Sequence, residues 1–121
     1  MRSTVLVVDD DRDIRDSLVE LLEDHGFRAL GAGNGREALE VLRTGADVPC
    51  LILLDLMMPV MDGREFREEQ LKNPEWTAIP VIVISAYNDV AEQARALAVD
   101  HLRKPLAMRP LIEAVRRYCS N

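Results

Sequence analysis

Four short apolar runs constrain the fold of this chain more than any other feature of its sequence. Val5–Val8, Leu51–Leu54 and Val81–Ile84 are continuous rather than alternating, and a weaker run covers Phe27–Leu30. Strands that are covered by helices on both faces have this composition, because neither set of side chains meets water. A fifth strand is expected around His101–Arg103. The runs therefore predict a parallel sheet of five strands.

Segments with helical spacing separate these runs. In each segment apolar residues recur every three or four positions, as Ile14, Leu18 and Leu21 do, so that one face is apolar. Successive runs lie on the order of 25 residues apart, which leaves room for one right-handed crossover helix each. The 121 residues, of which 48% are apolar, suffice for one domain. We predict a single α/β domain over residues 1–121, a three-layer sandwich with five helices.

The balance of charge limits the possible partners. The chain has 15 Lys and Arg against 21 Asp and Glu, a net charge of −6, which disfavours direct binding to nucleic acid or anionic lipid. Residues 1–25 are acidic and residues 101–121 are basic. The apolar run near the amino terminus is too short for a secretion signal or a membrane span, so we expect a cytoplasmic protein without membrane contact.

The two cysteines are far apart in the sequence. Cys50 and Cys119 have no paired spacing typical of a metal site. In a cytosolic protein such residues usually behave as small buried hydrophobic side chains, and this is the expectation here, in preference to a disulfide.

Polar side chains follow the apolar runs where the strands are expected to end. Asp9 and Asp10 follow the first run, Asp55 follows Leu51–Leu54, and Ser85 and Lys104 follow the fourth and fifth strands. Ligands of open parallel sheets bind at the carboxyl ends of the strands. Neighbouring carboxylates repel each other unless they are protonated or bridged by a cation. A hard divalent cation such as Mg²⁺, with carboxylate and phosphate oxygens as ligands, fits this set.

An aspartate that follows a strand is often only the N-cap of the next helix. We expect that structural role for Asp11 or Asp13. For Asp10 and Asp55 the presence of Ser85 and Lys104 at the same edge favours a functional site.

Four motifs in this order and at this spacing resemble the receiver domain of response regulators in two-component signalling. They are Val7-Val8-Asp9-Asp10-Asp11, Asp55-Leu56-Met57-Met58-Pro59-Val60-Met61-Asp62-Gly63, Ile84-Ser85-Ala86 and Leu102-Arg103-Lys104-Pro105. The resemblance spans the whole chain. It implies a flavodoxin-like fold with strand order 2-1-3-4-5.

The resemblance also implies a role for each residue of the site. Asp55 is expected to accept a phosphoryl group from a histidine kinase. Mg²⁺ is expected to be held by Asp10, by Asp55, by the backbone carbonyl of Met57 and, through water, by Asp9. Lys104 would supply further positive charge.

The same resemblance implies a switch. Ser85 would hydrogen-bond the phosphoryl group, and the signal would reach the face formed by the fourth helix, the fifth strand and the fifth helix. At the position where the family usually has Tyr or Phe, this chain has His101. A downstream protein is the expected partner of that face, and a homodimer is left open.

The resemblance also implies that two residues lie beside the path of water to the acyl phosphate, and both lack a carboxylate or amide that could orient it. These are Met57 and Tyr87, each two residues after Asp55 and Ser85 respectively, and we predict slow self-dephosphorylation.

Three other functions are considered. Two alternatives are a phosphorelay intermediate and a receiver-like interaction scaffold that acts without phosphorylation. An Mg²⁺-dependent phosphatase with an aspartyl nucleophile would need a second acid two residues after Asp55, where this chain has Met57. A signalling phosphoacceptor, rather than an enzyme, is therefore the prediction.

Overall fold

Strands and helices alternate along the computed structural model, which describes residues 4–45, 48–86, 90–97 and 99–119. The strands are β1 (Thr4–Val8), β2 (Arg28–Ala32), β3 (Leu51–Asp55), β4 (Val81–Ser85) and β5 (Asp100–Arg103). The helices are α1 (Arg12–Asp24), α2 (Gly35–Thr44), α3 (Gly63–Lys72), α4 (Val90–Ala96) and α5 (Met108–Tyr118).

The strands form one parallel sheet in the order β2-β1-β3-β4-β5. This confirms the predicted fold class and strand order. The weakest apolar run differs from its prediction, because β2 begins at Arg28 and continues to Ala32, while Phe27 is buried before the strand starts. As an edge strand β2 exposes several of its side chains, so its sequence lacks the continuous apolar character of the central strands.

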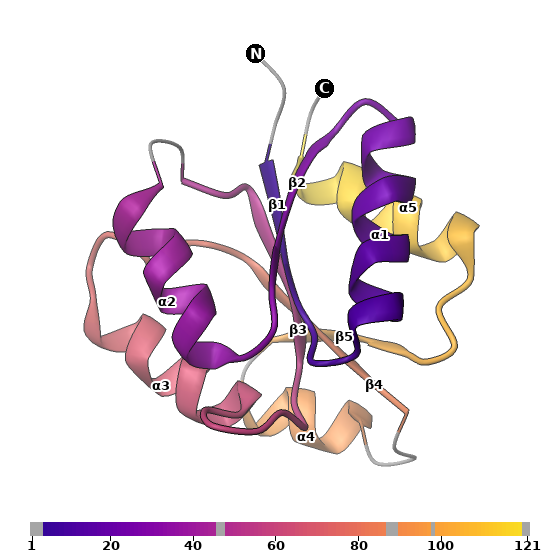
Figure 1. Cartoon of the computed structure of the whole chain (residues 1–121). Helices are drawn as coiled ribbons and strands as arrows, with labels where there is room; N and C mark the ends of the chain where they lie inside the picture. Colours follow the sequence, from indigo (N-terminus) through magenta and orange to yellow (C-terminus); the bar gives the residue numbers. More distant parts are fainter. Residues whose placement is uncertain (1–3, 46–47, 87–89, 98, 120–121) are drawn as a thin grey trace.

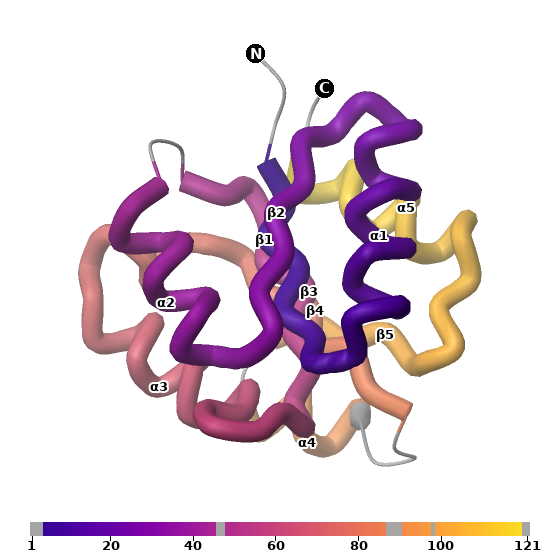
Figure 2. The backbone as a smooth tube through the Cα atoms, viewed as in Figure 1, coloured from indigo at the N-terminus to yellow at the C-terminus, as the bar shows by residue number. Residues whose placement is uncertain are grey.

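Helices cover both faces of the sheet (Figures 1 and 2). Successive side chains of a strand point to opposite faces, so Val5 and Val7 pack in one core cluster with residues of α1 and α5. Leu6 and Val8 pack in a second cluster with residues of α2 and α3. Among the described residues no helix is both long enough and apolar enough to cross a bilayer.

The expectation for the two cysteines is wrong, because Cys50 and Cys119 form a disulfide. Their Cα atoms lie 5.5 Å apart, a normal separation for this bond. Cys50 immediately precedes β3, and Cys119 follows the last turn of α5. Their separation of 69 positions in the sequence conceals this proximity, since only the packing of α5 against the sheet brings the two cysteines together.

A buried polar residue orders the segment that leads into β4. Gln70 of α3 is fully buried, and its Nε2 donates to the backbone oxygens of Trp76 (2.9 Å) and Ile79 (3.1 Å). Trp76 is 8% exposed and packs in the second core cluster. This segment lies at the amino ends of the strands, away from the edge where the predicted site residues occur.

Candidate functional site

The turn after β1 fixes the first two acids of the site. Asp11 is the N-cap of α1 and accepts hydrogen bonds from two backbone N–H groups of the first turn, which confirms the expectation for this residue. Asp9 is fully buried, and its Oδ1 accepts from the N–H of Asp11 at 2.9 Å. Arg15 of α1 donates from Nη1 to the backbone oxygen of Asp9 at 2.9 Å. Asp10, between Asp9 and Asp11 in the sequence, is exposed.

The loop after β3 closes tightly behind Asp55. This carboxylate ends β3, is 5% exposed and accepts a hydrogen bond from the N–H of Met57 at 3.2 Å. Gly63 donates its N–H to the backbone oxygen of Leu56 at 3.0 Å. A Cβ atom on Gly63 would lie only 2.7 Å from the backbone oxygen of Asp55, so this close approach requires glycine.

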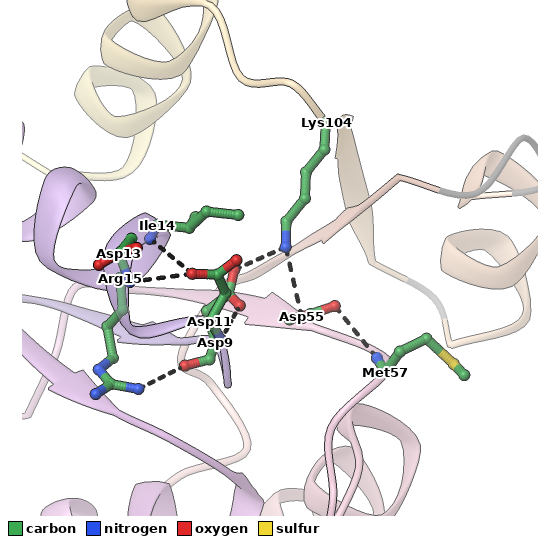
Figure 3. A network of polar contacts seen from close by, with 8 residues as sticks. All are labelled: Asp9, Asp11, Asp13, Ile14, Arg15, Asp55, Met57 and Lys104. Atoms are coloured by element: carbon green, nitrogen blue, oxygen red, sulfur yellow. Dashed lines mark hydrogen bonds and ion pairs between the residues drawn. The ribbon is translucent and has the colours of Figure 1, made fainter.

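Lys104 extends between two of the acids (Figure 3). Its Nζ lies 2.8 Å from Oδ2 of Asp9 and 3.5 Å from Oδ2 of Asp55. The backbone N–H of Lys104 donates to the backbone oxygen of Ser85 at 2.8 Å, which fixes the chain after β5 against the end of β4. A cis peptide bond joins Lys104 to Pro105.

Burial and charge act on the ionisable groups in opposite directions. Burial raises the pKa of Asp55 from 3.8 to about 6; the charge on Lys104 opposes this increase and Asp9 adds to it. For Lys104 burial alone would lower the pKa, but the contacts with Asp9 and Asp55 outweigh it and the net pKa is raised. The ammonium group therefore stays charged between the two carboxylates.

The three carboxylates fit a hard divalent cation. Asp9, Asp10 and Asp55 each offer one oxygen, and these oxygens lie within 4.8 Å of one another. Oδ2 of Asp9 is buried and, among the described residues, has the ion pair with Lys104 but no hydrogen bond. Lys104 supplies one positive charge against three carboxylates, so a further cation would offset the remaining negative charge, and oxygen ligands of this kind suit Mg²⁺.

The other predicted residues lie at or near the same edge. Ser85 ends β4 and is 1% exposed. Met57 directs its side chain away from Asp55 in Figure 3 and is 55% exposed. His101 lies in β5, where it is exposed and pairs with Val83 in the strand register. Tyr87 lies outside the described residues.

An apolar groove of about 360 Å³ adjoins the acidic cluster. One side of this groove is α1, with Ile14, Leu18 and Leu21, and the other is the segment after β5 that begins at Lys104 and includes Leu106. The groove therefore places apolar surface directly beside the ammonium group that contacts Asp9 and Asp55.

Sequence reasoning missed two residues that support the site. Arg15 was hidden among the charged residues of α1, and only its contact with the Asp9 carbonyl distinguishes it from a solvated arginine. Gly63 entered the sequence analysis only as the last residue of a motif, although its lack of a Cβ allows the loop to pass close to Asp55. The spacing of Asp55 and Gly63 around a proline was the available signal.

Comparisons with known proteins agree with this geometry. The family model described as "Response regulator receiver domain" matches residues 5–116. A 14.6 kDa uncharacterised protein of Leptolyngbya boryana is 38% identical over 118 residues, covering 95% of this chain and 88% of that protein. Response regulator MprA of Mycolicibacterium vanbaalenii is 36% identical over 93% of this chain; the chain spans about half, 48%, of MprA.

Solved structures give the same result. A response regulator receiver protein from Pseudomonas putida has a TM-score of 0.87 at 32% identity, with 97% of this chain and 98% of that chain covered. Chemotaxis protein CheY4 of Vibrio cholerae has a TM-score of 0.86 at 26% identity, with 98% and 99% covered.

Proposed function

Because this chain belongs to the response regulator receiver domain family, we propose that it is a signalling module that accepts a phosphoryl group from a histidine kinase on Asp55. The observation that carries the proposal is the placement of the buried Asp55 carboxylate beside Lys104 and two further acids. Phosphoryl transfer depends on positioning and on neutralisation of charge, and these residues supply both.

The reaction begins with an oxygen of the Asp55 carboxylate. This oxygen attacks the phosphorus of a phosphohistidine in line with the phosphorus–nitrogen bond. As the new oxygen–phosphorus bond forms, the phosphorus–nitrogen bond breaks and its electron pair returns to the imidazole nitrogen. The hydrogen bond from the N–H of Met57 to Oδ1 of Asp55 holds the carboxylate in one orientation.

The acidic cluster would hold Mg²⁺ through the carboxylates of Asp10 and Asp55, the backbone carbonyl of Met57 and, through water, Asp9. Bound Mg²⁺ neutralises charge on the transferred phosphoryl group. Lys104 adds a fixed positive charge, since its Nζ already lies 3.5 Å from Asp55. A short movement of Nζ away from Asp9 would let it contact a phosphoryl oxygen.

The proposed output depends on Ser85 and His101. Ser85 ends the strand next to β3, and its hydroxyl would bond a phosphoryl oxygen on Asp55. The backbone hydrogen bond between Lys104 and Ser85 would transmit a movement of Ser85 to the chain after β5. His101, exposed on β5, would take the place of the aromatic switch residue and pass the change to the face of α4, β5 and α5.

Two protein partners follow from this scheme. The histidine of the donor must approach Asp55 past Lys104, and the apolar groove between α1 and the segment after β5 fits a neighbouring apolar surface of that donor. The downstream protein would bind α4, β5 and α5, where the exposed Arg116 and Arg117 favour an acidic partner. We place both encounters in the cytoplasm.

A phosphorelay intermediate remains an alternative, in which Asp55 passes the phosphoryl group to a second histidine. A scaffold that acts without phosphorylation is favoured less, because Asp55, Asp10 and Lys104 are all present and grouped. A phosphatase is disfavoured because the side chain two residues after Asp55 is Met57, which cannot act as a general acid.

Intact-mass spectrometry tests the proposal. The protein is incubated with a small phosphodonor such as acetyl phosphate, with Mg²⁺ or with EDTA. We expect the mass of one phosphoryl group to be added in Mg²⁺ and to be lost in Asp55→Asn. The matched control is Asp16→Asn, whose side chain is 65% exposed on α1 and which should be modified like the wild type. An unmodified wild type, or equal modification of Asp55→Asn, would contradict the proposed function.

A further inference from the structure

The disulfide connects two parts of the fold that the phosphoryl chemistry does not use. Cys50 precedes β3, at the end of that strand opposite Asp55, and Cys119 follows α5. Each cysteine is held by a backbone hydrogen bond. The N–H of Cys50 donates to the backbone oxygen of Thr4 in β1 (2.8 Å), and the N–H of Cys119 donates to that of Val115 in α5 (2.8 Å). The backbone at both cysteines is therefore held by hydrogen bonds that do not involve the disulfide.

The fold around this pair does not depend on the bond. Leu111, Ile112, Ala114 and Val115 of α5 are all buried in the core cluster that covers one face of the sheet. Cys119 is itself 3% exposed in that cluster, so its reduced side chain would remain as a small apolar group. Both the dithiol and the disulfide form are thus compatible with the native packing.

We propose that Cys50 and Cys119 are a reversible thiol–disulfide pair, a redox modification site whose oxidised form fixes the end of α5 to the start of β3. In the cytoplasm, where the proposed function places the protein, thiols are normally kept reduced, and a disulfide there is usually transient or redox-sensing. The output helix α5 would then be free to adjust in the reduced protein and restrained in the oxidised protein. This last consequence rests on the proposed function, whereas formation and reduction of the bond do not.

A low-molecular-weight disulfide such as oxidised glutathione is a suitable oxidant. Cys50 is the accessible partner, since its side chain is only partly buried. Its thiolate attacks one sulfur of oxidised glutathione, forming a mixed disulfide and releasing one glutathione thiolate. The thiolate of Cys119 then attacks Sγ of Cys50, and a second glutathione thiolate leaves. Two protein thiols are oxidised and one glutathione disulfide is reduced to two thiols.

The bond should have a measurable effect on stability. It closes a loop of 69 residues, and closing a loop of this size in the unfolded chain lowers the unfolding equilibrium constant by about a thousandfold. Amide hydrogen exchange in the last turn of α5, residues 115–118, should also be slower in the oxidised protein, because that turn is joined covalently to the sheet.

The experiment uses the folded wild-type chain in glutathione buffers of increasing oxidised fraction. Alkylation of free thiols followed by intact-mass spectrometry should show two thiols in reducing buffer, none in oxidising buffer, and a return to two when reductant is restored. Urea denaturation should show the loss of stability on reduction. The matched control is the double variant Cys50→Ala/Cys119→Ala, which has no thiol and whose stability should not respond to the buffer. No phosphodonor is present, so this result is independent of the proposed phosphorylation.

Three outcomes would overturn the proposal. Two reactive thiols in the most oxidising buffer would show that the bond does not form. A bond that stays intact in the reduced buffer, even with a dithiol reductant added, would make it a permanent structural link. Equal stability of the two wild-type forms would show that the bond restrains nothing. All three are measured on the wild type, so they do not depend on whether a cysteine variant folds.

Discussion

Asp55 lies in an environment that is unfavourable for a negative charge. Burial raises its pKa to about 6, and the neighbouring Asp9 adds to that increase although Lys104 opposes it. A nucleophile must be deprotonated, and a pKa of about 6, which the charge on Lys104 keeps from rising further, leaves the carboxylate mostly ionised at neutral pH. The same environment that prepares the residue for phosphorylation therefore reduces the stability of the unmodified fold.

The stability of Asp55→Asn should depend on pH with a definite sign. In the folded protein Asp55 keeps its proton up to about pH 6, whereas in the unfolded chain it loses the proton near its ordinary pKa of 3.8. The wild type consequently loses stability as pH rises from about 4 to above 6. Without Mg²⁺, the variant should be more stable by about 1–3 kcal/mol at pH 7.5 and nearly equal at pH 3.5.

Urea denaturation followed by circular dichroism across this pH range, in EDTA, measures the difference. Asp16→Asn is again the control, since an exposed carboxylate should give no such trend. An advantage of Asp55→Asn that grows toward acid pH would contradict the assigned role of burial.

Met57 should prolong the phosphorylated state. Its thioether has no hydrogen-bond donor and is only a weak acceptor, so it cannot orient a water molecule as a carboxylate or amide could. In addition, its side chain is directed away from Asp55. In the described part of the chain no acid other than Asp9 and Asp10 groups with Asp55. We expect Met57→Asn to shorten the lifetime of the acyl phosphate by about tenfold, less than the roughly 10²–10⁴-fold of a positioned acid or base, because an amide only orients the water molecule.

The decay is measured by intact mass after the phosphodonor is removed, with Met57→Leu as the apolar control. A wild-type lifetime of only seconds that Met57→Asn leaves unchanged would count against this role.

At the scale of elements, the loop between β3 and α3 has a closely defined backbone conformation. Asp62 and Glu65 cap α3 reciprocally, each side chain accepting from the backbone N–H of the other residue. Val60 in the same loop has φ of 68°, a left-handed conformation that a β-branched side chain adopts only at a cost. This loop also leads directly out of Asp55, so its conformation determines where the carboxylate lies.

Gly63→Ala should show how closely this loop fits. Alanine would favour the first turn of α3, but its Cβ would lie 2.7 Å from the backbone oxygen of Asp55 and 2.8 Å from Cα of Leu56. Backbone atoms cannot move aside as a flexible side chain can. The steric clash of the added Cβ therefore costs more free energy than the higher helix propensity of alanine contributes. We expect a loss of about 1–3 kcal/mol in the free energy of unfolding, together with slower phosphorylation of Asp55.

Gly31→Ala is the matched control, because a Cβ there meets only the flexible side chain of Arg15, at 3.1 Å. Urea denaturation and the intact-mass assay measure both effects. Equal stability of the two alanine variants would show that the loop adjusts freely.

At the scale of the whole molecule, the sequence predicted the residues that gather at the carboxyl ends of the strands. It did not predict contacts between segments that are distant in the sequence. Asp9, Asp10 and Asp55 could be grouped because parallel strands bring their carboxyl ends to one edge. The bond between Cys50 and Cys119 could not be foreseen, since it depends on how α5 lies across the sheet. The complete burial of Gln70 was equally hidden, because its partners are backbone oxygens of a loop that has no periodic pattern.

The loop-closure effect of the disulfide is large on this scale. Loop closure across 69 residues contributes about 4 kcal/mol, a substantial part of the 5–15 kcal/mol that is typical of a domain of about this size. The redox state of one pair of sulfur atoms would thus change the stability of the entire fold more than any single substitution considered above.

The position of Trp76 makes the protein its own optical probe. It is the only tryptophan in the chain, and it is buried in the core at the amino ends of the strands, whereas Asp55 ends β3 at the opposite edge. Its fluorescence emission should change strongly when water enters the core on unfolding and little when Asp55 is modified. An unlabelled sample can therefore be titrated with urea before and after phosphorylation, and the shift in midpoint read from one intrinsic signal.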